Sequence, residues 1–139
     1  MRILGLDFGE KRIGVALSDP TGSIAQPLTS IPGAPRAEAL QAIRVLAEGH
    51  HVSEVVLGVP YSLTGLPSSQ TEACLAFARE LETNLGIPLR LIDERLTSKA
   101  AERVLISGGV DRKKRRGKVD RMAAALILQT HLDSRRRQE

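Results

Sequence analysis

Three short hydrophobic segments open the chain and predict three strands. Residues 3–8 form an apolar run closed by Gly9, which is typical of a buried strand. Residues 12–18 alternate between large apolar and small residues, which indicates a second strand joined to the first as a hairpin. Residues 23–31 carry a weaker pattern interrupted by Pro27, so we predict that this third strand lies at an edge of an antiparallel sheet.

The rest of the chain switches between helical and strand periodicity. Helical spacing of apolar residues, or residues that cap and stop helices, predicts helices over residues 36–49, 69–85, 97–107 and 119–132. Apolar runs predict strands over residues 52–59 and 88–92. The predicted order is therefore three strands, then helix, strand, helix, strand and two helices.

This order predicts an α/β fold in which about four helices flank a five-stranded mixed sheet, three strands antiparallel and the following ones parallel. It is the order expected for a ribonuclease H-like fold. With 139 residues, and with no internal repeat or linker, we expect one domain over residues 1–139.

Composition excludes several classes of protein. The one cysteine, Cys74, rules out an intrachain disulfide and a cysteine-based zinc site, and is expected in the core. The longest apolar run, Met122 to Leu128, is far shorter than the ~20 residues of a membrane span, and the N-terminus lacks the apolar length of a signal peptide. We expect a cytoplasmic protein with no membrane partner. Three aromatic residues are too few for a single-strand binder of the OB or RRM type.

Charge is unevenly distributed, although the net charge is only +4. Six basic residues fall within residues 112–118, and three more are Arg135, Arg136 and Arg137. Removing these nine from the 20 Lys and Arg leaves 11 against 16 Asp and Glu, a net charge of −5. An acidic body with two basic patches favours a polyanionic partner, nucleic acid before anionic membrane, over a solvated loop and a frayed tail.

Acidic residues at three places are candidates for chemistry. Asp7 ends an otherwise buried strand, so it either needs a cation or donor, or caps the turn that follows. Asp93 and Glu94 end the fifth strand, and since neighbours on a strand point to opposite faces, at most one of them faces the same site as Asp7. The alternative is a solvated strand end paired with Arg95. Asp120 lies in the first turn of the last predicted helix, where the helix dipole alone favours an acid.

Taken together, these carboxylates predict a metal site, provided that the fold brings them to one place. Carboxylate oxygens suit Mg²⁺ or Mn²⁺. Two such ions would activate a water and stabilise the leaving oxygen of a phosphodiester. The basic run directly before Asp120 would then hold the phosphate backbone. The three acidic positions are far apart in the chain, so spacing alone does not show that they converge.

Motifs over nearly the whole chain resemble the YqgF/RuvX family. They are Gly5–Gly9, Lys11–Ala16 with Ser18–Asp19, Gly58–Pro60 with Gly65, Asp93–Thr97, Arg112–Lys114, and Val119–Asp120 with Ala123–Ala124 and Ile127–Gln129. The resemblance implies a ribonuclease H-like nuclease related to the RuvC resolvase, which processes the 5′ end of pre-16S rRNA or resolves Holliday junctions. It places an acidic, metal-binding catalytic triad on Asp7, Glu94 and Asp120, with Asp93 as the alternative to Glu94. The loop after Pro60 departs from the family pattern, because Tyr61-Ser62-Leu63 stands where an Asn is commoner.

Several basic residues are candidates for binding nucleic acid. Arg12 would reach a phosphate near the metals or pair with Glu10, and Arg95 flanks the proposed acid. Thr97 is interpreted as a helix cap. The remaining candidates form a loop that would order on nucleic acid: Lys113, Lys114, Arg115, Arg116 and Lys118.

The sequence therefore supports three hypotheses of function. The leading one is a metal-dependent endonuclease acting on precursor rRNA or branched DNA with two Mg²⁺ or Mn²⁺ ions. The second is a non-catalytic nucleic-acid binder or ribosome-assembly factor on the same fold. The third is a sugar-kinase or actin-like ATPase, which Asp7-Phe8-Gly9 also resembles, but 139 residues supply one of the two domains that such enzymes need. A resolvase that makes two symmetric cuts would act as a homodimer, whereas processing of an end requires none.

Overall fold

A five-stranded mixed sheet forms the centre of the molecule. The computed structural model describes residues 1–62, 64–96 and 112–138, with the side chains of residues 96, 112–118, 137 and 138 left out of the description. The strands are β1 (Arg2–Asp7), β2 (Arg12–Ser18), β3 (Ala25–Pro32), β4 (Val52–Val59) and β5 (Leu89–Asp93), in the spatial order β3-β2-β1-β4-β5. β1, β2 and β3 pair antiparallel, whereas β4 pairs parallel with β1 and β5 pairs parallel with β4. The predicted mixed sheet, with the proline-containing strand at its edge, is confirmed.

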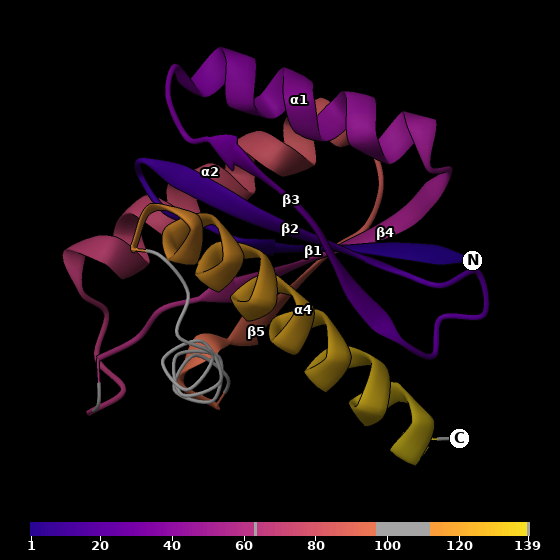
Figure 1. Ribbon diagram of the computed structural model, residues 1–139. Coiled ribbons are helices and arrows are strands. Elements are labelled where there is room, and N and C mark those ends of the chain that lie inside the picture. The colour runs from indigo at the N-terminus through magenta and orange to yellow at the C-terminus, as the bar shows by residue number, and fades with distance from the viewer. Residues whose placement is uncertain (63, 97–111, 139) are drawn as a thin grey trace.

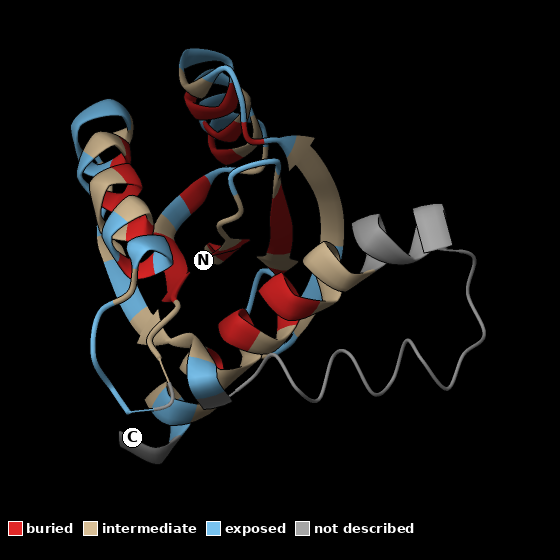
Figure 2. Ribbon diagram, turned by 90° about the vertical axis from the view of Figure 1, so that its left-hand side faces the viewer, coloured by how far each residue is buried: buried red, intermediate tan, exposed pale blue. Residues whose placement is uncertain are grey.

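Helices cover both faces of this sheet and make three layers (Figure 1). α1 (Arg36–Gly49) and α2 (Ser69–Leu85) pack on one face, and α4 (Arg112–Gln138) crosses the other. A short 3-10 turn, η1 (Glu94–Leu96), follows β5. Buried residues concentrate on the strands and on the sides of the helices that face them (Figure 2). The helix expected over residues 97–107, including Thr97, lies outside the described residues.

Local sequence signals set the limits of α2. The Ser68 hydroxyl accepts a hydrogen bond from the backbone N–H of Thr71, and the Thr71 hydroxyl accepts one from the N–H of Ser68. This reciprocal capping satisfies two donors that a helix start leaves without partners. At the other end Gly86 adopts a left-handed conformation, which ends the helix. The first turn of α2 is thereby fixed beside the carboxyl ends of the strands.

Three glycines let α4 lie very close to the sheet. A Cβ at Gly14 of β2 would come within 1.9 Å of the Asp120 carbonyl oxygen. A Cβ at Gly5 of β1 would lie 2.7 Å from the Cβ of Leu128, and one at Gly58 of β4 would lie 2.4 Å from Cδ1 of Ile127. These distances are shorter than van der Waals contact, so no side chain fits between helix and sheet at these positions. The close approach fixes where the start of α4 lies over the sheet.

The helical start of α4 corrects one expectation from the sequence. Residues 112–118 were expected to form a loop, but the helix begins at Arg112 and includes the basic run as its first turns. Lys and Arg are good helix formers, and the single Gly117 does not stop the helix. The side chains of this run lie outside the described residues.

The far end of α4 also extends further than the hydrophobic pattern predicted. The helix continues past residue 132 to Gln138. Arg135 pairs with Glu54 of β4 at 3.3 Å, and Arg136 donates a hydrogen bond to the Ser23 carbonyl at 3.0 Å. These contacts hold the last turns against the sheet, so the second basic patch binds the protein itself at two of its three arginines. Among the described residues no helix is long and apolar enough to cross a membrane.

Replacing Gly14 with alanine tests the close approach of α4. We expect Gly14→Ala to lower the free energy of unfolding by about 3 kcal/mol or more, because the added methyl group displaces the α4 backbone. Gly49→Ala is the matched control, since nothing lies within 4 Å of its Cβ position, and it should be neutral or stabilise by up to about 1 kcal/mol. Urea unfolding of both variants measures the difference. Equal stabilities of the two variants would show that α4 does not depend on this contact.

Candidate active site

The carboxyl ends of β1 and β5 place two acidic residues at the same edge of the sheet. Both strands run parallel to β4, so their ends meet there. Asp7 is the last residue of β1 and lies in register with Gly14 and Gly58, two of the three glycines that face α4. Residues in register point to the same face of a sheet, so Asp7 also points toward α4. Glu94 follows β5 directly.

Three carboxylates gather at this edge and raise the pKa of one of them. Burial raises the pKa of Asp7 well above its usual range, and a side-chain hydrogen bond with Glu94 and the negative charges of Glu94 and Asp120 raise it further. A negative charge on one carboxylate disfavours ionisation of a neighbouring one. The fold therefore brings together Asp7, Glu94 and Asp120, the three acids on which the family resemblance places the triad and whose spacing in the chain did not show that they meet.

The structure distinguishes Glu94 from its neighbour Asp93. Glu94 bonds to Asp7, whereas Asp93 accepts hydrogen bonds from the backbone N–H and the guanidinium of Arg95. These bonds lower the pKa of Asp93. Asp93 pairs in register with Val59, which packs in the core on the α1–α2 face, so strand alternation turns it away from Asp7. Of the two candidates, Glu94 is the one that joins the acidic cluster.

Arg12 pairs with Asp120 across the sheet–helix interface. Its Nε donates a hydrogen bond to Asp120 Oδ2 at 2.7 Å, and the Ser30 hydroxyl lies 3.5 Å from the same oxygen. The Asp120 side chain is 19% exposed, against 38% for Arg12. From the sequence, Glu10 was one possible partner of Arg12. In the structure Arg12 pairs with Asp120 instead. The guanidinium lies at the cleft, where it offsets part of the negative charge.

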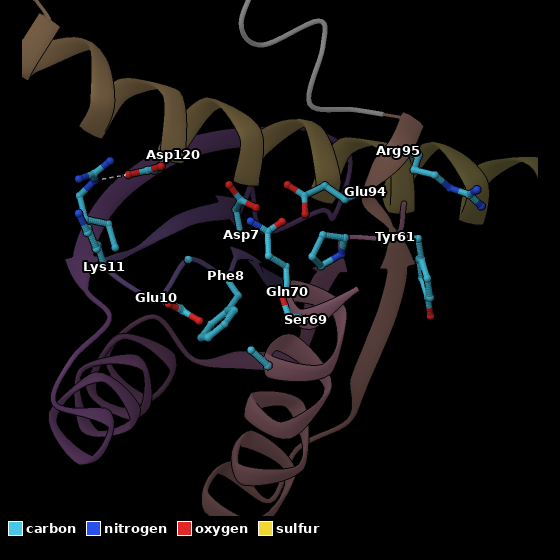
Figure 3. A pocket seen from close by; sticks show the side chains of 14 residues that line it. Asp7, Phe8, Glu10, Lys11, Tyr61, Ser69, Gln70, Glu94, Arg95 and Asp120 are labelled. Atoms are coloured by element: carbon cyan, nitrogen blue, oxygen red, sulfur yellow. Dashed lines mark hydrogen bonds and ion pairs between the residues drawn. The ribbon is translucent and has the colours of Figure 1, made fainter. Parts of the chain in front are cut away.

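These residues line an open cleft of about 760 Å³. In Figure 3, Asp7 and Glu94 lie in its middle, Asp120 lies toward one end, and Arg95 and Tyr61 lie toward the other. The cleft thus has carboxylates at its centre and cationic side chains on both sides. Such an alternation suits a chain of phosphates held by its flanks and attacked in the middle.

Several side chains that line the cleft were assigned no role in the site from the sequence. Among them, Lys11 lies next to Arg12, Gln70 lies in the first turn of α2, and Tyr61 lies in the segment after β4. Gln70 points toward Asp7 and Glu94 in Figure 3. The one signal for these residues in the sequence is that each lies close to the predicted end of a strand or start of a helix. Arg12 and Arg95, which were expected to bind nucleic acid, line the cleft; the side chains of Lys113, Lys114, Arg115, Arg116 and Lys118 lie outside the described residues.

The donor set of the cleft fits a hard divalent cation. Asp7 and Glu94 are adjacent carboxylates whose mutual repulsion a cation would remove, and Mg²⁺ and Mn²⁺ prefer such oxygens. Within the described ranges, no three His, Cys, Asp or Glu side chains are placed to hold one ion as they stand. The pairing of Asp120 with Arg12 accounts for this, because it keeps the third carboxylate on a guanidinium.

Replacing Asp7 with asparagine tests the electrostatic strain in this cluster. A raised pKa means that Asp7 favours folding while protonated and that this contribution is lost as the pH rises through its folded-state pKa. We expect Asp7→Asn to unfold at a higher urea concentration than the parent protein at pH 8 without divalent ions. In acid, where Asp7 is protonated, the two proteins should unfold at the same urea concentration.

Asp19→Asn is the control of opposite sign. Hydrogen bonds from the Thr21 hydroxyl and from the backbone of Ile24, Ser23 and Thr21 lower the pKa of Asp19, so its carboxylate favours folding above its ordinary pKa. This variant should lose stability at pH 8. If Asp7→Asn loses stability as well, the cluster is not strained in the way that we describe.

Comparison with known proteins identifies the family of the chain. The family described as RuvX, Holliday junction resolvase, matches residues 1–134. A protein of Syntrophus aciditrophicus named "Putative pre-16S rRNA nuclease" is 49% identical over 134 residues, covering 96% of this chain and 89% of its own length. A protein of the same name from Moorella thermoacetica is 47% identical over 133 residues, covering 96% and 95%.

A solved structure shows the same fold at much lower identity. It is Thermus thermophilus RuvC in complex with a Holliday junction substrate, with a TM-score of 0.59 and 15% identity over 98% of this chain and 96% of that one. The likeness supports the ribonuclease H-like architecture expected from the order of strands and helices. With the family match over nearly its whole length, the chain belongs to the RuvX family of Holliday junction resolvases and pre-16S rRNA nucleases.

Proposed function

We propose that the chain is a metal-dependent endonuclease that hydrolyses phosphodiester bonds in structured nucleic acid. The observation that carries this proposal is the meeting of Asp7, Glu94 and Asp120 at one cleft whose flanks are cationic. The names of the relatives point to pre-16S rRNA as the substrate, and the family description points to Holliday junctions. Of the two, we propose the precursor rRNA, because curated relatives at 41–49% identity carry that name.

Asp7 and Glu94 would hold the divalent ion, and Asp120 would join them in exchange for its bond to Arg12. When bound, Mg²⁺ or Mn²⁺, as one ion or a pair, lowers the pKa of a water and stabilises charge on the phosphate. The released Arg12 guanidinium would then bind a non-bridging phosphate oxygen close by. The position of Gln70, pointing toward Asp7 and Glu94, suits an amide that orients the attacking water.

Cations on both sides of the carboxylates would position the strand. Lys11 and Arg12 line one part of the cleft and Arg95 another. The run of Lys and Arg at residues 112–118 opens α4, the helix that carries Asp120, and we propose that it binds the phosphate backbone of the substrate. Phosphate contacts carry no sequence information, so the proposed substrate is recognised through its shape.

Cleavage by the three carboxylate variants tests the proposed chemistry. We expect Asp7→Asn, Glu94→Gln and Asp120→Asn each to lower kcat by roughly 100-fold or more in Mg²⁺ or Mn²⁺, because each removes an ion ligand. Glu48→Gln on the surface of α1 is the matched control, since Glu48 pairs with Arg44 and does not line the cleft. A 5′-extended rRNA precursor and a four-way DNA junction serve as substrates under the same metal condition.

Three outcomes would contradict the proposal, each in a different way. Wild-type turnover by Asp7→Asn would reject the metal site, and binding without cleavage by the parent protein would favour the assembly-factor hypothesis. Symmetric paired nicks on the junction, with the rRNA precursor uncut, would reject the proposed substrate and support a resolvase.

Thermal unfolding gives a readout that does not depend on activity. Bound Mg²⁺ or Mn²⁺ should stabilise the parent protein by about 2.7 kcal/mol at ~100 times its dissociation constant. Asp7→Asn should lose most of this gain, whereas Glu48→Gln should keep it. An equal rise of Tm in all three proteins would show that the ion binds elsewhere.

A further inference from the structure

Two of the three aromatic residues of the chain form a stacked pair, and two of the three, Phe8 and Tyr61, line the cleft. Phe8 and Phe77 stack on each other with ring centroids 4.6 Å apart, and the Arg36 guanidinium lies over both rings. Tyr61 lies apart from this stack, on the segment after β4, where it is half-buried and lines the cleft. Its ring contacts the edge of the core but is also open to what the cleft holds.

Arg95 lies against the Tyr61 ring and is paired with Asp93. Its guanidinium carbon is 5.9 Å from the Tyr61 ring centroid. Asp93 accepts hydrogen bonds from Nε and Nη2 of Arg95, which fixes the plane of the guanidinium. Gly65 approaches from the opposite segment, where a Cβ would lie 3.3 Å from Nη1 of Arg95. An arginine tied in this way is a preorganised planar group, unlike a mobile surface arginine.

The segment that carries Tyr61 is itself ordered by backbone bonds. The Leu66 carbonyl accepts hydrogen bonds from the backbone N–H and the hydroxyl of Ser62, at 3.2 and 2.9 Å. The Ser62 carbonyl accepts one from the N–H of Gly65 at 2.9 Å. These bonds close a turn directly after Tyr61.

Tyr61 and Arg95 stand beside the acidic cluster, on the side away from Asp120 (Figure 3). Arg95 follows Glu94 directly in the chain, and the Tyr61 ring lies against the Arg95 guanidinium, so both planar groups lie close to a carboxylate of the site. A strand lying along the cleft with a phosphate at Asp7 and Glu94 would bring a neighbouring nucleotide to this pair.

We propose that Tyr61 and Arg95 form a stacking shelf for one unpaired nucleobase adjacent to the scissile phosphate. Every nucleobase has a face that stacks on an aromatic ring or a guanidinium plane, and a phosphate alone gives no reason for an aromatic group at this place. A base in a continuous duplex is already stacked on both sides. The shelf therefore selects single-stranded or unstacked nucleotides at the cleavage point, and it rests on the proposed nuclease function.

Intrinsic fluorescence tests the shelf directly, because Tyr61 is the one tyrosine of a chain without tryptophan. The parent protein is titrated, without divalent ions, with a single-stranded oligonucleotide and with an abasic sugar–phosphate strand of the same length. Binding is followed independently by the anisotropy of a dye on each strand. We expect the base-containing strand to shorten or quench the tyrosine lifetime and the abasic strand to bind without doing so.

Variants separate stacking from packing. Tyr61→Leu should bind the base-containing strand about 5- to 150-fold more weakly and the abasic strand as tightly as the parent, and Tyr61→Phe should bind both like the parent. Leu66→Ala, in the same turn and 66% exposed, is the matched control and should change neither affinity.

The shelf is overturned if both strands change the tyrosine lifetime equally, or if the base-containing strand binds without changing it. Equal affinity of Tyr61→Leu and the parent protein for the base-containing strand overturns it as well. If the parent protein binds neither strand, the proposed nuclease function fails and the shelf fails with it.

Discussion

The close contact between α4 and the sheet is the constraint on which the site depends. Glycines at three strand positions, Gly5, Gly14 and Gly58, bring the helix backbone nearer than any side chain would allow. Asp7 lies in register with two of them and points to the same face. Asp120 reaches the carboxylates of the sheet because its own backbone lies on Gly14. The packing that holds the third layer thus also sets the geometry of the acidic cluster.

This packing collects negative charge that the isolated protein accommodates in two ways. A hydrogen bond between Asp7 and Glu94 and a raised pKa of Asp7 reduce the repulsion within the cluster, and Arg12 neutralises Asp120. Burying these carboxylates lowers the free energy of unfolding. Burial of the hydrophobic cores on the two faces of the sheet offsets this loss. The repulsion among these carboxylates favours binding of a cation, either the Arg12 guanidinium or a metal ion.

Much of the fold could be predicted from the sequence, because periodicity and capping residues act locally. The limits of β2, α1, β4 and α2 are those that the hydrophobic spacing indicated, and the proline placed β3 at the edge. The start of α4 could not be predicted in this way, because its first turns carry charge in place of an apolar stripe. Its end depends on the contact of Arg135 with Glu54, which is far away in sequence.

The candidate site could be predicted as a set of residue types and not as a geometry. Strand alternation showed that Asp93 and Glu94 face opposite ways, but only the pairing of β5 with β4 shows which of them meets Asp7. The pairing of Arg12 with Asp120 spans 108 positions and leaves no local signal. From the sequence, Tyr61 was only a departure from the family pattern. Its contact with Arg95 could not be predicted, because the two residues follow different strands.

A crystal structure of the protein with Mn²⁺, located by its anomalous scattering, tests the central claim most directly. The account predicts an ion between the carboxylates of Asp7 and Glu94, with Asp120 turned from Arg12 toward the metal. The account is contradicted if the cleft holds no ion at saturating Mn²⁺, or if the ion lies elsewhere while Asp120 keeps its bond to Arg12.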